Sequence, residues 1–177
     1  MKKLFLSASL LLAVLFSVKA QKGNNQIGIA AEVGFPTGSF KDGINTGFGG
    51  TIRGLFGVGN TGQVTVTTGY VNFQAEGNTT EGSASAAIVP ILAGYRLSMG
   101  GLYIEPQVGY GVYIAKIKFD GATISSSSGA FTYSAGVGFA KNNVDIGVRY
   151  QSGSVEGDNV GYIGVHLGYN FSLGAKK

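Results

Sequence analysis

The sequence predicts an all-β fold in which eight antiparallel strands close into an up-and-down barrel. Apolar and polar residues alternate with period 2 in eight separate segments, which is the pattern of strands with two different faces. The connections between these segments alternate between short and long, as in a series of hairpins. The chain also contains 31 glycines, which strands and turns accommodate better than helices do.

The first three segments set the pattern. In the first, the odd-numbered residues from Ile27 to Phe35 are apolar. In the second, the even-numbered residues are apolar or glycine, and Arg53 lies on the other face. In the third, Val71 and Phe73 break the alternation, so the pattern defines the end of this strand poorly. In chain order the eight segments are 27–35, 48–58, 63–73, 87–97, 102–114, 131–139, 144–151 and 161–171.

The five later segments keep the alternation. The fourth and fifth contain Pro90 and Pro106, which cannot donate a ladder hydrogen bond and so predict a bulge or another local irregularity. The fifth segment, with the run YIEPQVGYGVYI, carries Glu105 on its polar face. The last three alternate strictly, and the final one has His166 on its polar face.

The lengths of the connections indicate which kind of barrel this is. Short turns at one end of the barrel and long loops at the other are typical of a transmembrane β-barrel. The segments have about the 9–11 residues that a tilted transmembrane strand needs. The short connections are GNTG (59–62), SMGG (98–101) and KNN (141–143), and the longer polar ones are PTGSFKDGINT, QAEGNTTEGSAS, the stretch through FDGATISSSSG, and SGSVEGDN.

Side-chain volume and surface chemistry predict that the apolar faces point outward, toward lipid. The interior of an eight-stranded barrel is barely wide enough for side chains, and the small residues of the polar faces suit it better than Ile, Leu, Phe and Tyr. A glycine-rich wall with few charges is also far from the surface of a soluble domain. Aromatic residues near strand ends fit the girdles at the membrane interfaces: Phe35, Phe48, Phe56, Tyr95, Tyr150, Tyr169 and Phe171.

Residues 1–20 have the pattern of a cleaved signal peptide, which leaves 21–177 as the barrel, with strands within about 26–171. Lys2 and Lys3 precede the apolar run LFLSASLLLAVLFSV, and a cleavage site before Gln21 follows. Without Lys2, Lys3 and Lys19, ten basic residues face nine acidic ones, so the charge does not favour a nucleic-acid partner. The absence of cysteine excludes disulfides, thiol chemistry and a lipid-modified N-terminal cysteine.

The signal peptide, the eight alternating strands, the alternating connections and the final strand GYIGVHLGYNF resemble the small eight-stranded outer-membrane β-barrel family, of the OmpX and OmpA barrel type. The resemblance implies the outer membrane of a Gram-negative bacterium, with short turns in the periplasm and long loops outside. It implies outer-membrane lipids and lipopolysaccharide as surroundings, and insertion machinery that recognises the last strand, which ends at the aromatic Phe171. We expect a monomer with no cofactor.

The polar faces carry a balanced set of charges, which predicts an ion-pair network inside the barrel. A lone charge in a narrow lumen is expensive, and pairing offsets that cost. The short turn SMGG places Arg96 beside Glu105, and Glu32 and Arg53 also lie on neighbouring strands. The residues of this predicted network are Glu32, Arg53, Arg96, Glu105, Asp145, Arg149 and His166.

Three classes of function remain open, and we expect a non-enzymatic protein with a structural or surface-interaction role through its outer loops. The alternative is a narrow channel for ions or small solutes, against which the large inward residues Tyr103, Tyr113 and Tyr162 argue. A lipid-modifying enzyme would need a nucleophile beside His166, and Ser134 is not on an adjacent strand.

Two further patterns are weak. The run GVGNTG at 57–62 has the glycine spacing of a dinucleotide site, but a strand rather than a helix follows it, which favours a hairpin turn. Acidic residues in the outer loops could bind Ca²⁺ or bridge to lipopolysaccharide, but they have no ligand spacing and are expected to be solvated.

Overall fold

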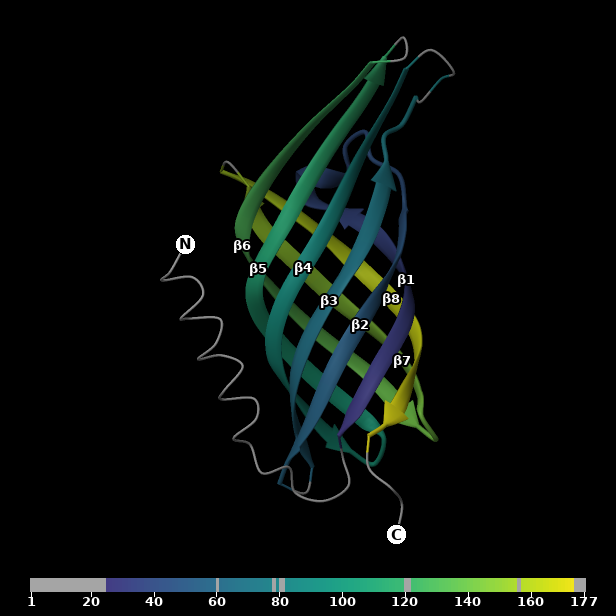
Figure 1. Ribbon diagram of the computed structural model, residues 1–177, viewed down its shortest axis with the longest axis vertical. Helices are drawn as coiled ribbons and strands as arrows, with labels where there is room; N and C mark the ends of the chain where they lie inside the picture. Colours follow the sequence, from purple (N-terminus) through teal and green to yellow (C-terminus); the bar gives the residue numbers. More distant parts are fainter. Residues whose placement is uncertain are drawn as a thin grey trace.

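The described residues of the computed structural model form a closed barrel of eight antiparallel strands, as predicted (Figure 1). These residues are 25–173 except positions 60, 78, 80–81, 120–121 and 156, so the predicted signal peptide lies outside them. Each strand pairs with the next, and β1 pairs with β8 to close the ring. The elements are β1 (Gln26–Thr37), the short 3-10 helix η1 (Gly38–Lys41), β2 (Gly47–Val58), β3 (Gly62–Gln74), β4 (Gly82–Met99), β5 (Leu102–Phe119), β6 (Ala122–Lys141), β7 (Val144–Val155) and β8 (Asp158–Ser172).

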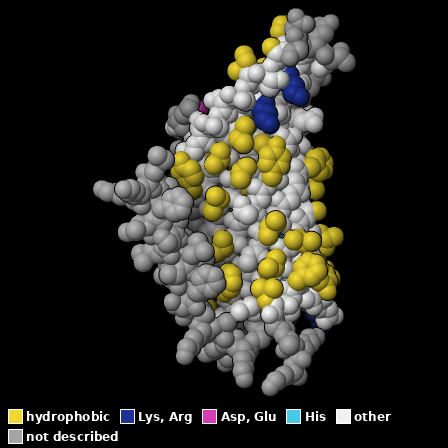
Figure 2. Space-filling view, in the orientation of Figure 1, with side chains coloured by type: hydrophobic (Ala, Val, Ile, Leu, Met, Phe, Trp, Pro, Cys, Tyr) yellow, Lys and Arg dark blue, Asp and Glu magenta, His cyan; other side chains and the backbone are white. Residues whose placement is uncertain are grey.

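The two faces of the wall are those that the alternation predicts. Outward residues such as Ile52 and Ile91 are each 57% exposed, whereas the inward Thr65 is fully buried and Glu32 is only 1% exposed. Apolar side chains are spread over the visible part of the wall in Figure 2, with white surface between them. No helix in the described part of the chain is long and apolar enough to cross a membrane.

Tight turns join the strands at one end of the barrel. Asn142 and Asn143 both have positive φ, 51° and 73°, and so do Gly100 and Gly101, at 63° and 98°. Two central residues with positive φ match the right-handed twist of the strands that they join. These turns fix the register of β4 with β5 and of β6 with β7.

At the other end, three strands are longer than the alternation predicts. The sequence QAEGNTTEGSAS and the stretch through FDGATISSSSG were expected to be loops, but much of both is strand: β4 begins at Gly82, β5 ends at Phe119 and β6 begins at Ala122. The pairing Lys116↔Ser125 shows that β5 and β6 continue as one hairpin. We call this extension, 82–86, 115–119 and 122–128, the projecting sheet, and Figure 1 shows it rising beyond the other strands.

The connection between β7 and β8 is also shorter than expected. SGSVEGDN was predicted to be a loop, but β7 runs to Val155 and β8 begins at Asp158. The longest described connection at this end instead follows β1 and contains η1. The long-loop prediction failed in these places because the outer strands continue in polar sequence, where no lipid-facing alternation marks them.

The polarity of the sheet inverts where the projecting sheet begins. On β5 the outward row is apolar from Leu102 to Ile114, and the next outward positions are Lys116 and Lys118. The apolar row is roughly 40 Å long at about 3.3 Å per residue. At a strand tilt of about 40° it spans about 30 Å along the barrel axis, the thickness of a bilayer's hydrocarbon core. Lys116 therefore marks the outer edge of the lipid-facing band.

Val71 and Phe73 do not break strand β3; both point inward and are fully buried. They belong to an apolar cluster that fills the lumen near the projecting sheet, with Ile88, Tyr113, Ala130 and Tyr162. Gly34 and Gly47 make room for the Phe73 ring, since a Cβ on Gly34 would lie 2.9 Å from its Cζ atom. The break in the alternation at Val71 and Phe73 thus marks the level at which the inward residues become apolar. It does not mark the end of the strand.

The inversion predicts that the same substitution has different effects on the two sides of Lys116. Ile52→Lys places a charge in the lipid-facing wall and should destabilise the barrel by about 2–4 kcal/mol. Ile124→Lys, on the projecting sheet, should change the free energy of unfolding by less than about 1 kcal/mol. Urea unfolding in lipid vesicles measures both. Equal destabilisation by the two substitutions would show that the band does not end at Lys116.

Candidate functional site

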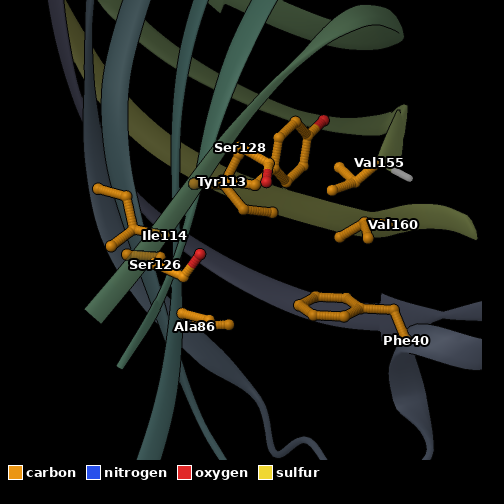
Figure 3. A pocket seen from close by; sticks show the side chains of 11 residues that line it. Phe40, Ala86, Tyr113, Ile114, Ser126, Ser128, Val155 and Val160 are labelled. Atoms are coloured by element: carbon orange, nitrogen blue, oxygen red, sulfur yellow. The ribbon is translucent and has the colours of Figure 1, made fainter. Parts of the chain in front are cut away.

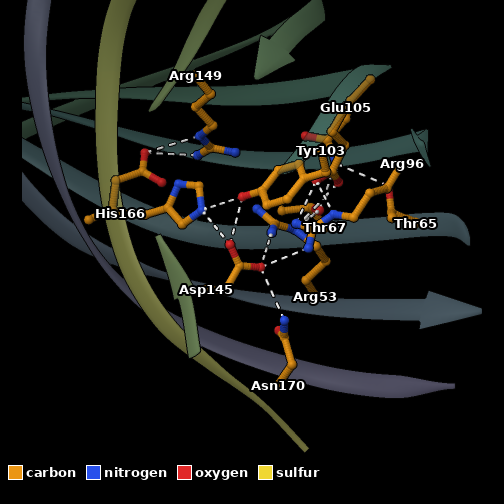
Figure 4. Close-up of polar contacts among 12 residues, drawn as sticks. Arg53, Thr65, Thr67, Arg96, Tyr103, Glu105, Asp145, Arg149, His166 and Asn170 are labelled. Carbon is orange, nitrogen blue, oxygen red and sulfur yellow. Dashed lines mark hydrogen bonds and ion pairs between the residues drawn. The ribbon is translucent and has the colours of Figure 1, made fainter. Parts of the chain in front are cut away.

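Arg96 on β4 is the centre of a buried ion-pair cluster in the lumen. Its Nη2 lies 2.7 Å from Glu105 Oε2, and its Nη1 lies 2.8 Å from Asp145 Oδ2. Its guanidinium also stacks on the ring of Tyr103, 3.7 Å from the ring centroid. Glu105 is near because the turn at 100–101 makes β4 and β5 neighbours, whereas Asp145 reaches Arg96 across the lumen from β7 (Figure 4).

Arg53 on β2 faces the same two carboxylates. Its Nε lies 3.5 Å from Glu105 Oε1, and its Nη1 lies 3.6 Å from Asp145 Oδ2. The Nε–H also donates to Thr67 Oγ1, at 3.2 Å. Two arginines and two carboxylates therefore share one buried space, and their formal charges cancel.

Polar side chains donate to the remaining lone pairs of these carboxylates. The Tyr103 hydroxyl donates to Asp145 Oδ1 at 2.6 Å, and Asn170 Nδ2 donates to Asp145 Oδ2 at 3.1 Å. Gln107 Nε2 donates to Glu105 Oε1 at 2.9 Å. Buried carboxylates are tolerated when they have both a counter-charge and such donors.

His166 lies at the edge of this cluster. Its Nε2 is 3.1 Å from the Tyr103 hydroxyl and 3.3 Å from Asp145 Oδ1. Gly147 on β7 leaves room for both rings, because a Cβ there would lie 2.7 Å from the Tyr103 hydroxyl and from the His166 ring. The neighbours of His166 are thus an acid and a phenol, and no serine hydroxyl is bonded to it in the described residues.

A second, smaller cluster contains Glu32, Arg149 and Tyr162. Arg149 Nη2 lies 2.9 Å from Glu32 Oε1, and the Tyr162 hydroxyl donates to the same oxygen at 3.0 Å. Arg149 Nη2 also donates to the Tyr162 hydroxyl, at 2.9 Å. The three side chains come from β1, β7 and β8.

Glu32 and Arg53 lie on neighbouring strands but do not form a pair, and register explains why. Arg53 is paired with Gly28 and Glu32 with Gly49, which separates the two charges by about 13 Å along the strands at 3.3 Å per residue. Glu32 instead crosses over β8 to reach Arg149 on β7. It passes Gly164, which is the register partner of Arg149. A Cβ on Gly164 would lie 2.6 Å from Glu32 Oε1. The missing side chain of Gly164 makes this contact possible.

All seven residues of the predicted network therefore lie inside the barrel, in two clusters. The alternation alone did not predict the bonding roles of Tyr103, Gln107, Tyr162 and Asn170, although each of them has the same parity as the inward charges on its strand.

A void of about 10 Å³ beside Arg53 and Asn170 has room for about one water molecule. Side chains thus fill the described lumen through two polar layers and the apolar cluster.

The described lumen contains neither a metal-binding group nor a serine paired with a base. No three His, Cys, Asp or Glu side chains among the described residues converge as a metal-binding group. Ser134 is buried, and its hydroxyl has no hydrogen-bond partner, so it is not paired with a base. What this arrangement does physically is neutralise buried charge and exclude water.

The two clusters predict a specific pattern of energetic coupling. A double-mutant cycle of Glu32→Ala with Arg149→Ala should give a coupling energy of about 1–3 kcal/mol, because the two side chains are in direct contact. The cycle of Glu32→Ala with Arg53→Ala should give less than about 0.5 kcal/mol, because these side chains share no partner. Free energies of unfolding from urea titrations supply both cycles, and a larger coupling for the second would contradict the clusters.

Comparison with known proteins agrees with this architecture. The family model described as "Outer membrane protein beta-barrel domain" matches residues 8–171. A search of curated proteins found no significant match.

Several solved structures share the fold at low sequence identity. The attachment invasion locus protein Ail of Yersinia pestis has a TM-score of 0.65 at 17% identity, covering 85% of this chain and 100% of Ail. Neisserial surface protein A has a TM-score of 0.58 at 16% identity, covering 85% and 99%. The N-terminal β-barrel domain of OprF from Pseudomonas aeruginosa has a TM-score of 0.57 at 14% identity, covering 85% and 100%. Because the family model matches well over half of the sequence, this chain belongs to the outer membrane protein β-barrel domain family and is a protein of the outer membrane.

Proposed function

We propose that this protein is a non-enzymatic outer-membrane barrel that acts through its extracellular side, with the lumen serving only as a structural core. The observation that carries the proposal is the contrast between the charged groups inside the barrel and the residues of the projecting sheet. The inward charged side chains are paired with one another in the two clusters, whereas the β5 and β6 ends of the projecting sheet are exposed beyond the lipid-facing band.

The filled lumen argues against transport. A channel needs a continuous wet path, but Arg96 and Glu32 are each 1% exposed, and Phe73 and Tyr162 are fully buried above them. Opening a path would separate paired charges in a confined space, which costs several kcal/mol. The narrow-channel alternative therefore requires a rearrangement of both clusters.

The surroundings of His166 argue against lipid modification. Its ring lies inside the barrel, on the opposite face of the wall from the lipid, and it is 4% exposed. A lipid substrate in the membrane would have to reach the ring through the sheet. Asp145, its acid neighbour, is already engaged by Arg96, Tyr103 and Asn170.

The projecting sheet is the part of the outer side most suited to contact a partner. Its outward face carries Lys116 and Lys118 among serines and threonines, and its other face carries Ile117, Phe119 and Ile124. One similar structure is Ail in complex with the heparin analogue sucrose octasulfate. Charge does not favour a sulfated ligand here, because the outer segments have six acidic residues against three lysines: Asp42, Glu76, Glu81, Asp120, Glu156 and Asp158 against Lys41, Lys116 and Lys118.

A shortened hairpin tests the surface role. Residues 117–124 are replaced by Asn-Gly, which joins the paired residues Lys116 and Ser125 through a two-residue turn. In a strain that lacks the native gene, the full chain and a His166→Ala variant should restore attachment of cells to surfaces, and the shortened chain should not. All three proteins should keep the heat-dependent shift on SDS gels that reports a folded barrel.

Two results would contradict the proposal. Loss of function in the His166→Ala variant, with the barrel folded, would favour an enzyme. A steady conductance of the purified native protein in planar bilayers, lost in Arg149→Ala, would favour the narrow channel.

A further inference from the structure

A blind cavity lies in the outer mouth of the barrel, above the apolar cluster. It has a volume of about 280 Å³, close to the lower end of the roughly 300–1,000 Å³ of small-molecule sites. One wall comes from β4, β5 and β6, with Ala86, Tyr113 and Ser128. The opposite wall comes from η1, β7 and β8, with Phe40, Val155 and Val160 (Figure 3). The cavity is independent of the ion-pair clusters described above.

The lining specifies an apolar, uncharged ligand. None of the described residues that line this cavity carries a charge, and the polar groups among them are the hydroxyls of Tyr113, Ser126 and Ser128. The Tyr113 hydroxyl is already bonded to Thr132 Oγ1, at 2.9 Å. A charged group placed here would lose its hydration without gaining a counter-charge.

The floor of the cavity is closed. Tyr113 and Ile88 line the cavity and also belong to the buried apolar cluster, together with Phe73 and Tyr162. Phe40, which forms part of the opposite wall, packs edge-on against Phe73 with ring centroids 5.2 Å apart. A ligand therefore has to enter from the extracellular side.

An apolar strip leads from the cavity onto the projecting sheet. Ala115 lines the cavity, and the next residues with the same orientation on β5 are Ile117 and Phe119, which are 56% and 68% exposed. Ile124, the register partner of Ile117 on β6, is 71% exposed. From Ala115 to Phe119 the strip is about 13 Å long at 3.3 Å per residue. A narrow cavity that continues into a straight apolar strip matches a linear chain better than a compact ring.

We propose that this cavity binds the alkyl chain of an amphiphile, either a free fatty acid or one acyl chain of a membrane lipid. The methyl end of the chain lies against Tyr113 and Ile88, and the chain runs outward along Ile117 and Phe119. The polar head group stays in water beyond the cavity. Burial of the chain and of the exposed strip removes apolar surface from water, which is the driving force for binding. This binding does not depend on the surface role proposed above.

A tryptophan reporter can test the cavity directly, because the chain contains no tryptophan. Phe40→Trp places the reporter in the cavity wall, and Phe48→Trp, on the lipid-facing wall, measures the background from probe dissolved in the bilayer. The proteins are held in phosphatidylcholine nanodiscs and titrated with ω-bromododecanoic acid, whose bromine quenches tryptophan fluorescence. We expect saturable quenching of the Phe40→Trp reporter well above that of the Phe48→Trp reporter.

Filling the cavity provides the matched control. Ala86→Phe in the Phe40→Trp background should weaken binding roughly tenfold or more, because the added ring occupies the space of several methylene groups. Ala93→Phe, on the lipid-facing side of the same strand, should leave binding unchanged. If Ala86→Phe does not give the heat-dependent gel shift of a folded barrel, Ala115→Phe serves in its place.

A second arm identifies the source of the chain. Nanodiscs of phosphatidylcholine with one brominated acyl chain replace the fatty acid, and quenching of the Phe40→Trp reporter that Ala86→Phe removes would assign the ligand to a membrane lipid. Selective quenching only by the free acid would assign it to a fatty acid. The proposal is overturned if the free acid does not quench the Phe40→Trp reporter above the Phe48→Trp background and the brominated lipid does not quench the Phe40→Trp reporter. It is also overturned if Ala86→Phe leaves the quenching unchanged in both arms.

Discussion

The structure depends on one constraint: charged side chains inside a lumen too narrow for bulk water must neutralise one another. Arg53 and Arg96 face Glu105 and Asp145 in one layer, and Arg149 faces Glu32 in the next. Closure of the barrel makes the longer of these contacts possible, because Asp145 on β7 reaches Arg96 on β4 across the lumen. The contacts in turn fix which strands face each other, so closure and pairing support one another.

This constraint also explains where glycine occurs. Tyr103 and Glu32 can lie across the lumen only because Gly147 and Gly164 have no side chain at the facing positions. At these two positions a long side chain from one strand lies over a glycine on another. Such packing is consistent with the proposed role on the outer side.

The sequence predicts much of this structure because a strand has a period of two. The alternation of each strand identified the charges on its polar face, and the short turn SMGG at 98–101 was enough to place Arg96 beside Glu105. Parity gives no register between strands, so it could not show that Glu32 lies far from Arg53 and close to Arg149. The alternation also did not predict the strand ends beyond the membrane, because residues there do not contact lipid and need not be apolar on the outer face. Lys116 and Ser125 belong to strands, but outside the membrane their alternation inverts and their composition is that of a loop.

The outer end of the molecule combines the apolar cluster, the cavity and the projecting sheet, and there the inward face is apolar and the outward face polar. A soluble β-protein has the same distribution, and it makes this end the part of the barrel that can offer apolar contacts to molecules from outside. The central claim remains that buried ion pairs hold the barrel closed. The free energy of unfolding of Glu105→Ala, measured in lipid vesicles beside the exposed control Glu76→Ala, tests it most directly. The account predicts a loss of about 3–5 kcal/mol for Glu105→Ala, because Arg96 and Arg53 lose a shared partner, and almost no change for the control. An unchanged stability of Glu105→Ala would contradict the account.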